Sequence, residues 1–362
     1  MSLLNSYIDE AVNMPIGESV ENVEPLFEAW NTGETNDMFR LLGEFNSSMR
    51  EVDEGVIYAD SFATIAESKG NIEKSELLIE STIKDYFTKF INAIKKLWAK
   101  TKAFITNLLK SIQVSIVDVN KSLQNIDKYI SGKDFSKLTY LGYEWTDTNI
   151  SQEIAKNSLA AITIINGSAK YVQNQANKLV STNGNSLSKA GTNTIDAITN
   201  DDKSRKLIKM GNFGTVMGAN DAITQAEMND QIKAAYGCRD TKSELKVDQN
   251  KLKSMITFLK GFNGNATLKN LKKNTDSVFS NTIKGIQDMQ SSVNNLSSGN
   301  EKGQKIVSQC ASALRSLCSS AQGIVSAFNS AMGVCIQCEK SRFSEYRSVV
   351  ASAIRYNKKP EN

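Results

Sequence analysis

The chain has 362 residues and a formal net charge of +4, and it contains 3 prolines and no histidine. The absence of histidine excludes Ser-His-Asp, Cys-His and histidine–metal chemistry, so we expect a non-enzymatic protein without a metal or cofactor. The scarcity of proline favours long uninterrupted helices, because proline breaks helix interiors.

The two ends of the chain differ in charge. Residues 1–80 contain 17 acidic and 4 basic residues, whereas residues 81–362 contain 22 acidic and 39 basic ones. This asymmetry predicts an acidic N-terminal segment followed by a body that faces polyanions. The first ten residues include acids where a signal peptide has basic residues, so we expect no signal peptide. The sequence contains no uncharged apolar run of about 18 residues, so we expect no membrane span.

Modest helical pieces are predicted in residues 1–80. Partial apolar periodicity covers Ser2 to Asn13 and Val23 to Trp30, and a better pattern covers Asn36 to Ala66. We treat residues 1–80 as one acidic segment that is a candidate removable propeptide.

Residues 81–131 carry the clearest helical pattern. Apolar residues recur there at steps of three and four, which predicts a long amphipathic helix of up to about 75 Å. Ser81 is placed as its N-cap and Gly132 as its stop. Lysines crowd its first half, opposed there only by Asp85.

The remaining segments predict a helical bundle. Residues 133–147 are aromatic and irregular, and predict a turn or a short strand pair. Residues 181–221 are rich in Gly and Asn and predict loops around a short basic helix near Lys203 to Met210. Further helices are expected at Asn149 to Val180, Ala222 to Phe262, Ala266 to Leu296 and Lys302 to Tyr356.

The expected fold is therefore all-α, an elongated bundle of long helices with a short irregular aromatic segment and Gly/Asn-rich loops. We divide the chain into the acidic segment 1–80, the basic helix and its successor at 81–180, a loop-rich connector at 181–221 and a C-terminal helical bundle at 222–362.

Cysteines gather near the C-terminus. Cys335 and Cys338 form a C-x-x-C, with Cys310 and Cys318 upstream. Four thiolates can bind zinc, but the helical pattern around them favours core packing, with metal or redox use as the alternative. The odd count of five, without a secretion signal, argues for a reducing compartment.

The glycine-rich stretch around Gly211, Gly214 and Gly218 does not match a phosphate-binding motif. No strand is predicted before it. We interpret it as a flexible loop.

The basic helix allows three interpretations. Its apolar stripe can be core beneath a solvated basic face, it can lie on a membrane surface, or its lysines can meet nucleic acid without sequence preference. The candidate polyanion or membrane face comprises Lys84, Lys89, Lys95, Lys96, Lys100, Lys102, Lys110 and Trp98.

The charge reversal falls at Leu78-Ile79-Glu80 followed by Ser81. This sequence resembles the prohead-protease site of T4-like and other large tailed phages, where cleavage follows Glu. Glu67 followed by Ser68 also matches. With the acidic segment and the lysine helix, residues 1–130 resemble a head-internal or prohead core protein of a large tailed bacteriophage.

That resemblance implies a virion structural protein of the capsid interior, made in the host cytoplasm and cleaved after Glu80 or Glu67. Its expected partners are other virion proteins (itself, the capsid or the portal), non-specific DNA and the prohead protease. The alternatives are a helical, pore-forming type of membrane protein, with a membrane as partner, and a virion adaptor or tail component that makes only protein contacts.

Overall fold

The computed structural model describes residues 85, 88–89, 91–103, 106, 132–135, 137–182, 202–262, 266–294 and 301–356. The acidic segment 1–80 and its predicted helices lie outside the described residues. So does much of the predicted 81–131 helix, of which residues 91–103 form a continuous helical stretch.

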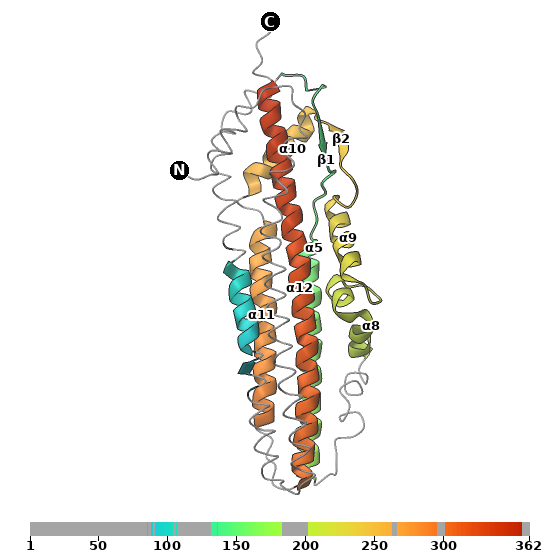
Figure 1. Ribbon diagram of the computed structural model, residues 1–362, viewed down its shortest axis with the longest axis vertical. Helices are drawn as coiled ribbons and strands as arrows, with labels where there is room; N and C mark the ends of the chain where they lie inside the picture. Colours follow the sequence, from blue (N-terminus) through green and yellow to red (C-terminus); the bar gives the residue numbers. More distant parts are fainter. Residues whose placement is uncertain are drawn as a thin grey trace.

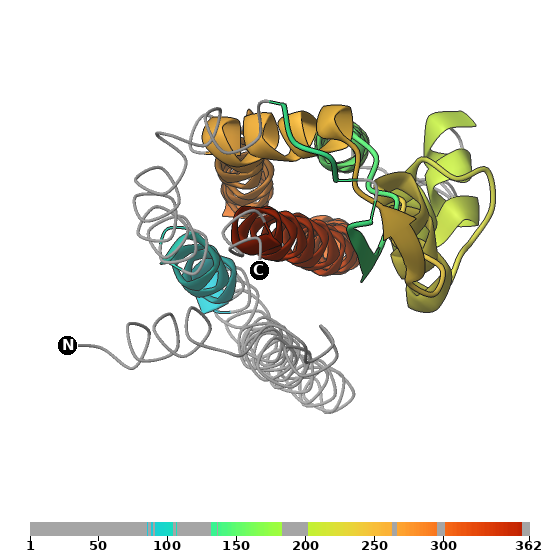
Figure 2. The same ribbon diagram turned by 90° about the horizontal axis from the view of Figure 1, so that it is seen from above.

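Three long helices form the centre of the molecule. They are α5 (Ile150–Ser181), α11 (Ala266–Asn294) and α12 (Glu301–Tyr356), and Figures 1 and 2 show them side by side along the long axis. Helices α5 and α11 run in the same direction, because Asn166 lies against Gly285 and Gln173 binds Ser292 one stretch further along both. Helix α12 runs in the opposite direction, with Cys318 against Met289 and Phe343 against Phe262.

Helix α12 is buried on most of its surface. Residues 324–336 of α12 are almost all buried, and they are mainly small or aliphatic side chains punctuated by Phe328. Small side chains let neighbouring helices approach closely, and a helix that is buried all round belongs at the core of a bundle. Contacts from α5, α8, α9, α10 and α11 accordingly reach α12.

Shorter helices flank this core. Helix α8 (Asp202–Met217) and helix α9 (Gln225–Tyr236) lie on the side of α5 and α12 away from α11 (Figures 1 and 2). Thr224 and Glu227 form a capping box at the start of α9. Helix α10 (Gln249–Gly261) begins at Asp248, whose carboxylate accepts the Lys251 N–H at 2.6 Å.

The aromatic segment contributes one strand. Strand β1 (Thr139–Gly142) pairs antiparallel with β2 (Ser243–Lys246), with Thr139 opposite Lys246 and Gly142 opposite Ser243. The partner strand lies inside Ala222 to Phe262, which the sequence pattern predicted as one helix. That prediction was wrong, because Gly237 ends α9 in a left-handed conformation and the S-E-L-K-V stretch is extended.

The predicted loop around the three glycines was also wrong in part. The first helical stretch of α8 ends at Gly211, in agreement with the short helix expected near Lys203 to Met210, but a second stretch follows to Met217 and contains Gly214. Gly211 interrupts α8 with φ 64°, a conformation that glycine adopts without steric cost. A local kink therefore replaces the expected loop.

The described residues otherwise confirm the all-α fold. Helices α5, α11 and α12 begin and end within two residues of their predicted bounds. Among the residues described, extended structure is confined to the β1–β2 pair.

Candidate polyanion-binding site

The helix at 91–103 is amphipathic as the sequence predicts. Ile91, Ile94 and Leu97 join the hydrophobic core, with Ile94 completely buried. Exposed lysines occupy its other side at positions 89, 95, 96 and 102. The helix lies beside α11, at the edge of the bundle away from α8 and α9 (Figures 1 and 2).

Trp98 joins this helix to α11. Its indole ring stacks on Phe279, with ring centroids 6.4 Å apart and planes 7° from parallel. The indole N–H donates to Asp276 Oδ1 at 2.9 Å. Two independent contacts therefore fix the helix on α11, and burial of an aromatic ring contributes much of the attraction.

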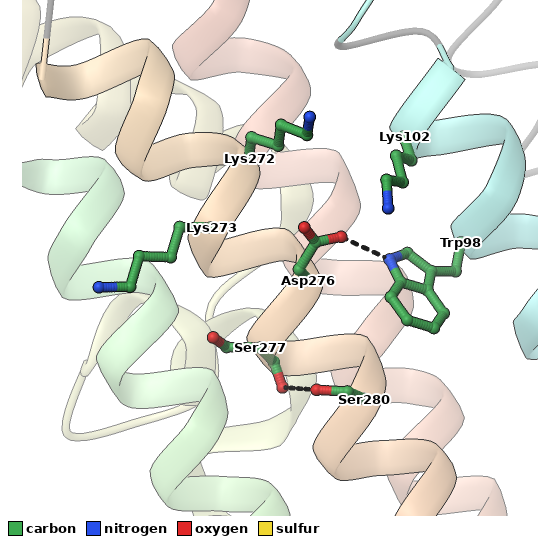
Figure 3. A pocket seen from close by; sticks show the side chains of 7 residues that line it. All are labelled: Trp98, Lys102, Lys272, Lys273, Asp276, Ser277 and Ser280. Carbon is green, nitrogen blue, oxygen red and sulfur yellow. Dashed lines mark hydrogen bonds between the residues drawn. The ribbon is translucent and has the colours of Figure 1, made fainter.

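A cavity of about 500 Å³ lies at this junction. Figure 3 shows its side chains, which come from the 91–103 helix and from α11: Trp98, Lys102, Lys272, Lys273, Asp276, Ser277 and Ser280. In this view Lys102 points toward Trp98 and Asp276, while Lys273 points away from them on the other side of α11.

The cavity lining is positively charged. Lys102 and Lys272 lie near a single carboxylate, that of Asp276, which already accepts the indole N–H, and Lys273 lines the cavity with its ammonium turned away (Figure 3). The Lys102 ammonium also lies 5.9 Å from the centroid of the Trp98 ring. Ammonium groups around one site attract phosphate oxygens as point charges, and the hydroxyls of Ser277 and Ser280 add further polar groups. The arrangement suits an anion rather than a metal ion.

The sequence-predicted face is only partly assembled at the cavity. Trp98 and Lys102 line it, whereas Lys89, Lys95 and Lys96 are exposed on the same helix outside it, and Lys100 is half-buried. Lys84, Lys110 and the candidate processing residues Glu67, Ser68, Glu80 and Ser81 lie outside the described residues.

Sequence reasoning missed the contribution of α11. Lys272 and Lys273 belong to an L-K-N-L-K-K run within a helix that the periodicity predicted correctly. This basic run was the feature of the sequence that could have indicated that α11 contributes to the cavity. The hydrogen bond that brings α11 to Trp98 comes from Asp276, 178 positions later, and no local pattern reveals such a tertiary contact.

The C-terminal cysteines pack in the core, as their helical context predicted. Cys310, Cys318, Cys335 and Cys338 are buried and reduced. Cys318 Sγ contacts Met289 Sδ at 3.5 Å. In the part of the chain that the structure describes, no cluster of three or more Cys, Asp or Glu side chains could hold a metal ion.

The aromatic segment is clamped to α12 by two charged residues. Glu345 accepts hydrogen bonds from Trp145 Nε1 at 2.9 Å and from the Tyr143 N–H at 3.2 Å. Arg342 forms an ion pair with Asp147 at 2.7 Å, and its guanidinium lies 4.3 Å from the Phe258 ring centroid. Both of these α12 side chains are therefore enclosed by aromatic rings and backbone.

Burial raises the pKa of Glu345 to about 7. The hydrogen bonds from Trp145 and Tyr143 and the charges of Lys242 and Lys251 oppose that rise. The net effect favours the neutral acid, because the cost of desolvating a carboxylate exceeds what these partners return.

The described residues include no helix long and apolar enough to cross a membrane. The apolar stripe of the 91–103 helix is turned into the protein core, so in this structure a lipid surface would meet its lysines.

Comparison of the chain with protein-family models, curated proteins and solved structures finds no match.

Proposed function

We propose that this chain is a non-enzymatic structural protein of a large tailed phage virion, located in the capsid interior, whose basic helical body binds DNA without sequence preference. The observation that carries the DNA-binding part is the cavity at which lysines from the 91–103 helix and from α11 converge. The phage assignment is supported by the charge partition and by the Glu-Ser junctions at positions 67 and 80.

The mechanism follows from electrostatics. Each lysine that neutralises a phosphate releases a counterion, so affinity depends on salt and not on base sequence. The residues after position 80 carry an excess of basic over acidic side chains, which adds a general attraction to the local site. Before cleavage the acidic segment offsets part of that excess, so the full-length chain binds DNA more weakly than the cleaved chain but still binds it at low salt.

The test uses full-length protein and a fluorescent duplex of arbitrary sequence, with anisotropy read across a salt series. The triple variant Lys102→Gln/Lys272→Gln/Lys273→Gln removes three ammonium groups from the cavity. We expect weaker binding at low salt and a log–log salt slope shallower by up to about 2.7, since each of the three lost phosphate contacts reduces the slope by about 0.9.

The matched control removes the same charge elsewhere. Lys203 and Lys206 are exposed on α8 and Lys246 is exposed on β2. Both elements lie on the side of the core away from the 91–103 helix (Figures 1 and 2). The variant Lys203→Gln/Lys206→Gln/Lys246→Gln should retain most of the slope. An equal loss of salt slope in the two triple variants would show that only the net charge of the chain matters. Absence of DNA binding by the unmodified chain at low salt would contradict the proposed DNA binding.

A further inference from the structure

Two cysteines from different elements meet at the end of α9. The Sγ atoms of Cys238 and Cys338 lie 3.6 Å apart, although the residues are 100 positions apart in the chain. Both are reduced. Cys338 belongs to the buried face of α12, whereas Cys238 remains partly exposed.

Local sequence places Cys238 there. Helix α9 ends at Tyr236, and Gly237 follows with φ 76°. The Gly237 N–H donates to Ala234 O at 3.0 Å and the Cys238 N–H donates to Lys233 O at 2.9 Å, the paired bonds that close a Schellman motif. A Cβ at position 237 would collide with the carbonyl oxygen of Glu144, so the turn carrying Cys238 is held against the aromatic segment.

The two thiols differ in acidity. The contact with Cys338 and the charge of Lys233 lower the pKa of Cys238, although its burial acts in the opposite direction. The same contact and burial raise the pKa of Cys338. The first proton therefore leaves Cys238, which puts the thiolate on the more accessible sulfur and a neutral thiol directly behind it.

We propose that Cys238 and Cys338 form a reversible disulfide when the protein meets a peroxide, with Cys238 as the reacting thiolate and Cys338 as the resolving thiol. The Cys238 thiolate attacks one peroxide oxygen, the O–O bond breaks, and a sulfenic acid and hydroxide result. The hydroxide takes up the proton that Cys238 released. The Cys338 sulfur then attacks the Cys238 sulfur, the S–O bond breaks, and water leaves with the Cys338 proton.

The balance is two thiols and one hydrogen peroxide giving one disulfide and two waters. Two equivalents of an external thiol reduce the disulfide back to the two cysteine thiols. The sulfurs must close from 3.6 Å to the disulfide length of about 2.05 Å. Cys238 lies in the turn after α9, so the turn can supply that movement while α12 stays in place. This thiol chemistry is independent of DNA binding.

The bond would tie the C-terminal end of α9 to the central helix. It would close a span of 100 residues, and a cross-link across a long span restricts the unfolded chain more than a short one does. We therefore expect the oxidised form to unfold at a higher temperature than the reduced form.

The experiment uses the full chain, reduced, freed of reductant and treated with one equivalent of hydrogen peroxide. We expect thiol titration in denaturant to fall from five to three per chain, with intact mass lower by two hydrogen atoms. Peptide mapping should recover a cross-link between Cys238 and Cys338. The thermal midpoint should rise and return after treatment with dithiothreitol.

Variants separate the two roles. Cys338→Ser should leave a sulfenic acid on Cys238 that a carbon-nucleophile probe traps, whereas Cys238→Ser should not react. Cys310→Ala, which changes a buried cysteine elsewhere on α12, should still form the cross-link. Retention of all five thiols by the unmodified chain, cross-links between chains, or sulfinic acid at Cys238 with Cys338 still reduced would each overturn the proposal.

Discussion

Glu345 shows how much one buried carboxyl can affect the molecule. It lies on α12, about 200 positions from Tyr143 and Trp145, which donate hydrogen bonds to it. A neutral carboxylic acid retains a carbonyl oxygen for those donors and avoids the cost of desolvating a charge. The attachment of the aromatic segment to α12 should therefore depend on pH.

We expect Glu345→Gln to flatten the pH dependence of stability. The folded-state pKa of about 7 lies above the ordinary value of 4.5, so folding favours the protonated acid. The stability that this provides is complete below pH 4.5 and is lost as the pH rises through 7. Between pH 5 and pH 8 the free energy of unfolding of the unmodified chain should fall relative to that of the variant, by up to about 3 kcal/mol.

Urea unfolding at several pH values measures this difference. Glu244→Gln, which alters an exposed carboxylate on β2, serves as the control and should leave the profile of the unmodified chain unchanged. Parallel profiles for Glu345→Gln and the unmodified chain would show that this carboxyl does not titrate differently in the folded state.

Individual contacts of this kind were beyond prediction from sequence. The sequence singled out Trp98 and Lys102 from their position in a strong amphipathic pattern, and both line the cavity. It gave no indication of Cys238, because a single cysteine after a glycine carries no pattern until the fold brings Cys338 within 3.6 Å of it.

At the scale of elements, the 91–103 helix belongs to the bundle core and also carries lysines of the proposed DNA-binding site. Its apolar residues are packed in the core while its lysines remain outside. Loss of its packing should therefore disturb the cavity that it forms with α11, even when every lysine is retained.

Ile94→Ala tests that coupling. Ile94 is completely buried, and truncating such a side chain lowers the free energy of unfolding by about 2–5 kcal/mol. We expect this loss together with weaker DNA binding in the salt titration described above. Asn92→Ala, two residues earlier and exposed, should change stability by no more than about 0.5 kcal/mol.

Loss of stability with unchanged DNA binding would show that the lysines act without a fixed helix position. Unchanged stability would contradict the burial of Ile94.

Helix prediction from the sequence succeeded where the apolar pattern is long and was wrong near glycines. Helices α5, α11 and α12 have long apolar patterns, and these are the most readable signal in a sequence. The failures occur at glycines. Gly211 adopts a non-helical conformation at a kink between two helical stretches of α8, and Gly237 ends a helix inside an apparently continuous helical stretch. The residue type alone does not distinguish these outcomes, because each depends on what packs against the turn.

At the scale of the whole molecule, the charge partition is the main sequence feature bearing on assembly. The acidic first 80 residues precede a basic body, and the Glu80–Ser81 junction separates them. If cleavage occurs there, the body that remains carries 39 basic and 22 acidic residues. Removal of the acidic segment would then switch the protein from charge-compensated to strongly cationic.

Mass spectrometry of mature particles containing this chain tests the switch. We expect a protein species that begins at Ser81, or at Ser68 if only the first junction is cut. Peptides that span Glu80–Ser81 should be absent from mature particles and present in immature ones. Peptides spanning Glu80–Ser81 in high yield from mature particles would contradict cleavage at that junction.

The central position of α12 has a mechanical consequence. Helix α12 contains 56 residues, which corresponds to about 84 Å of continuous helix. The helices α5, α8, α9, α10 and α11 all contact it, so the surrounding helices pack against one central helix. A force applied at one end would pass along its backbone hydrogen bonds to the other end. A pull along the long axis would therefore meet one uninterrupted helix that five neighbouring helices support from the side.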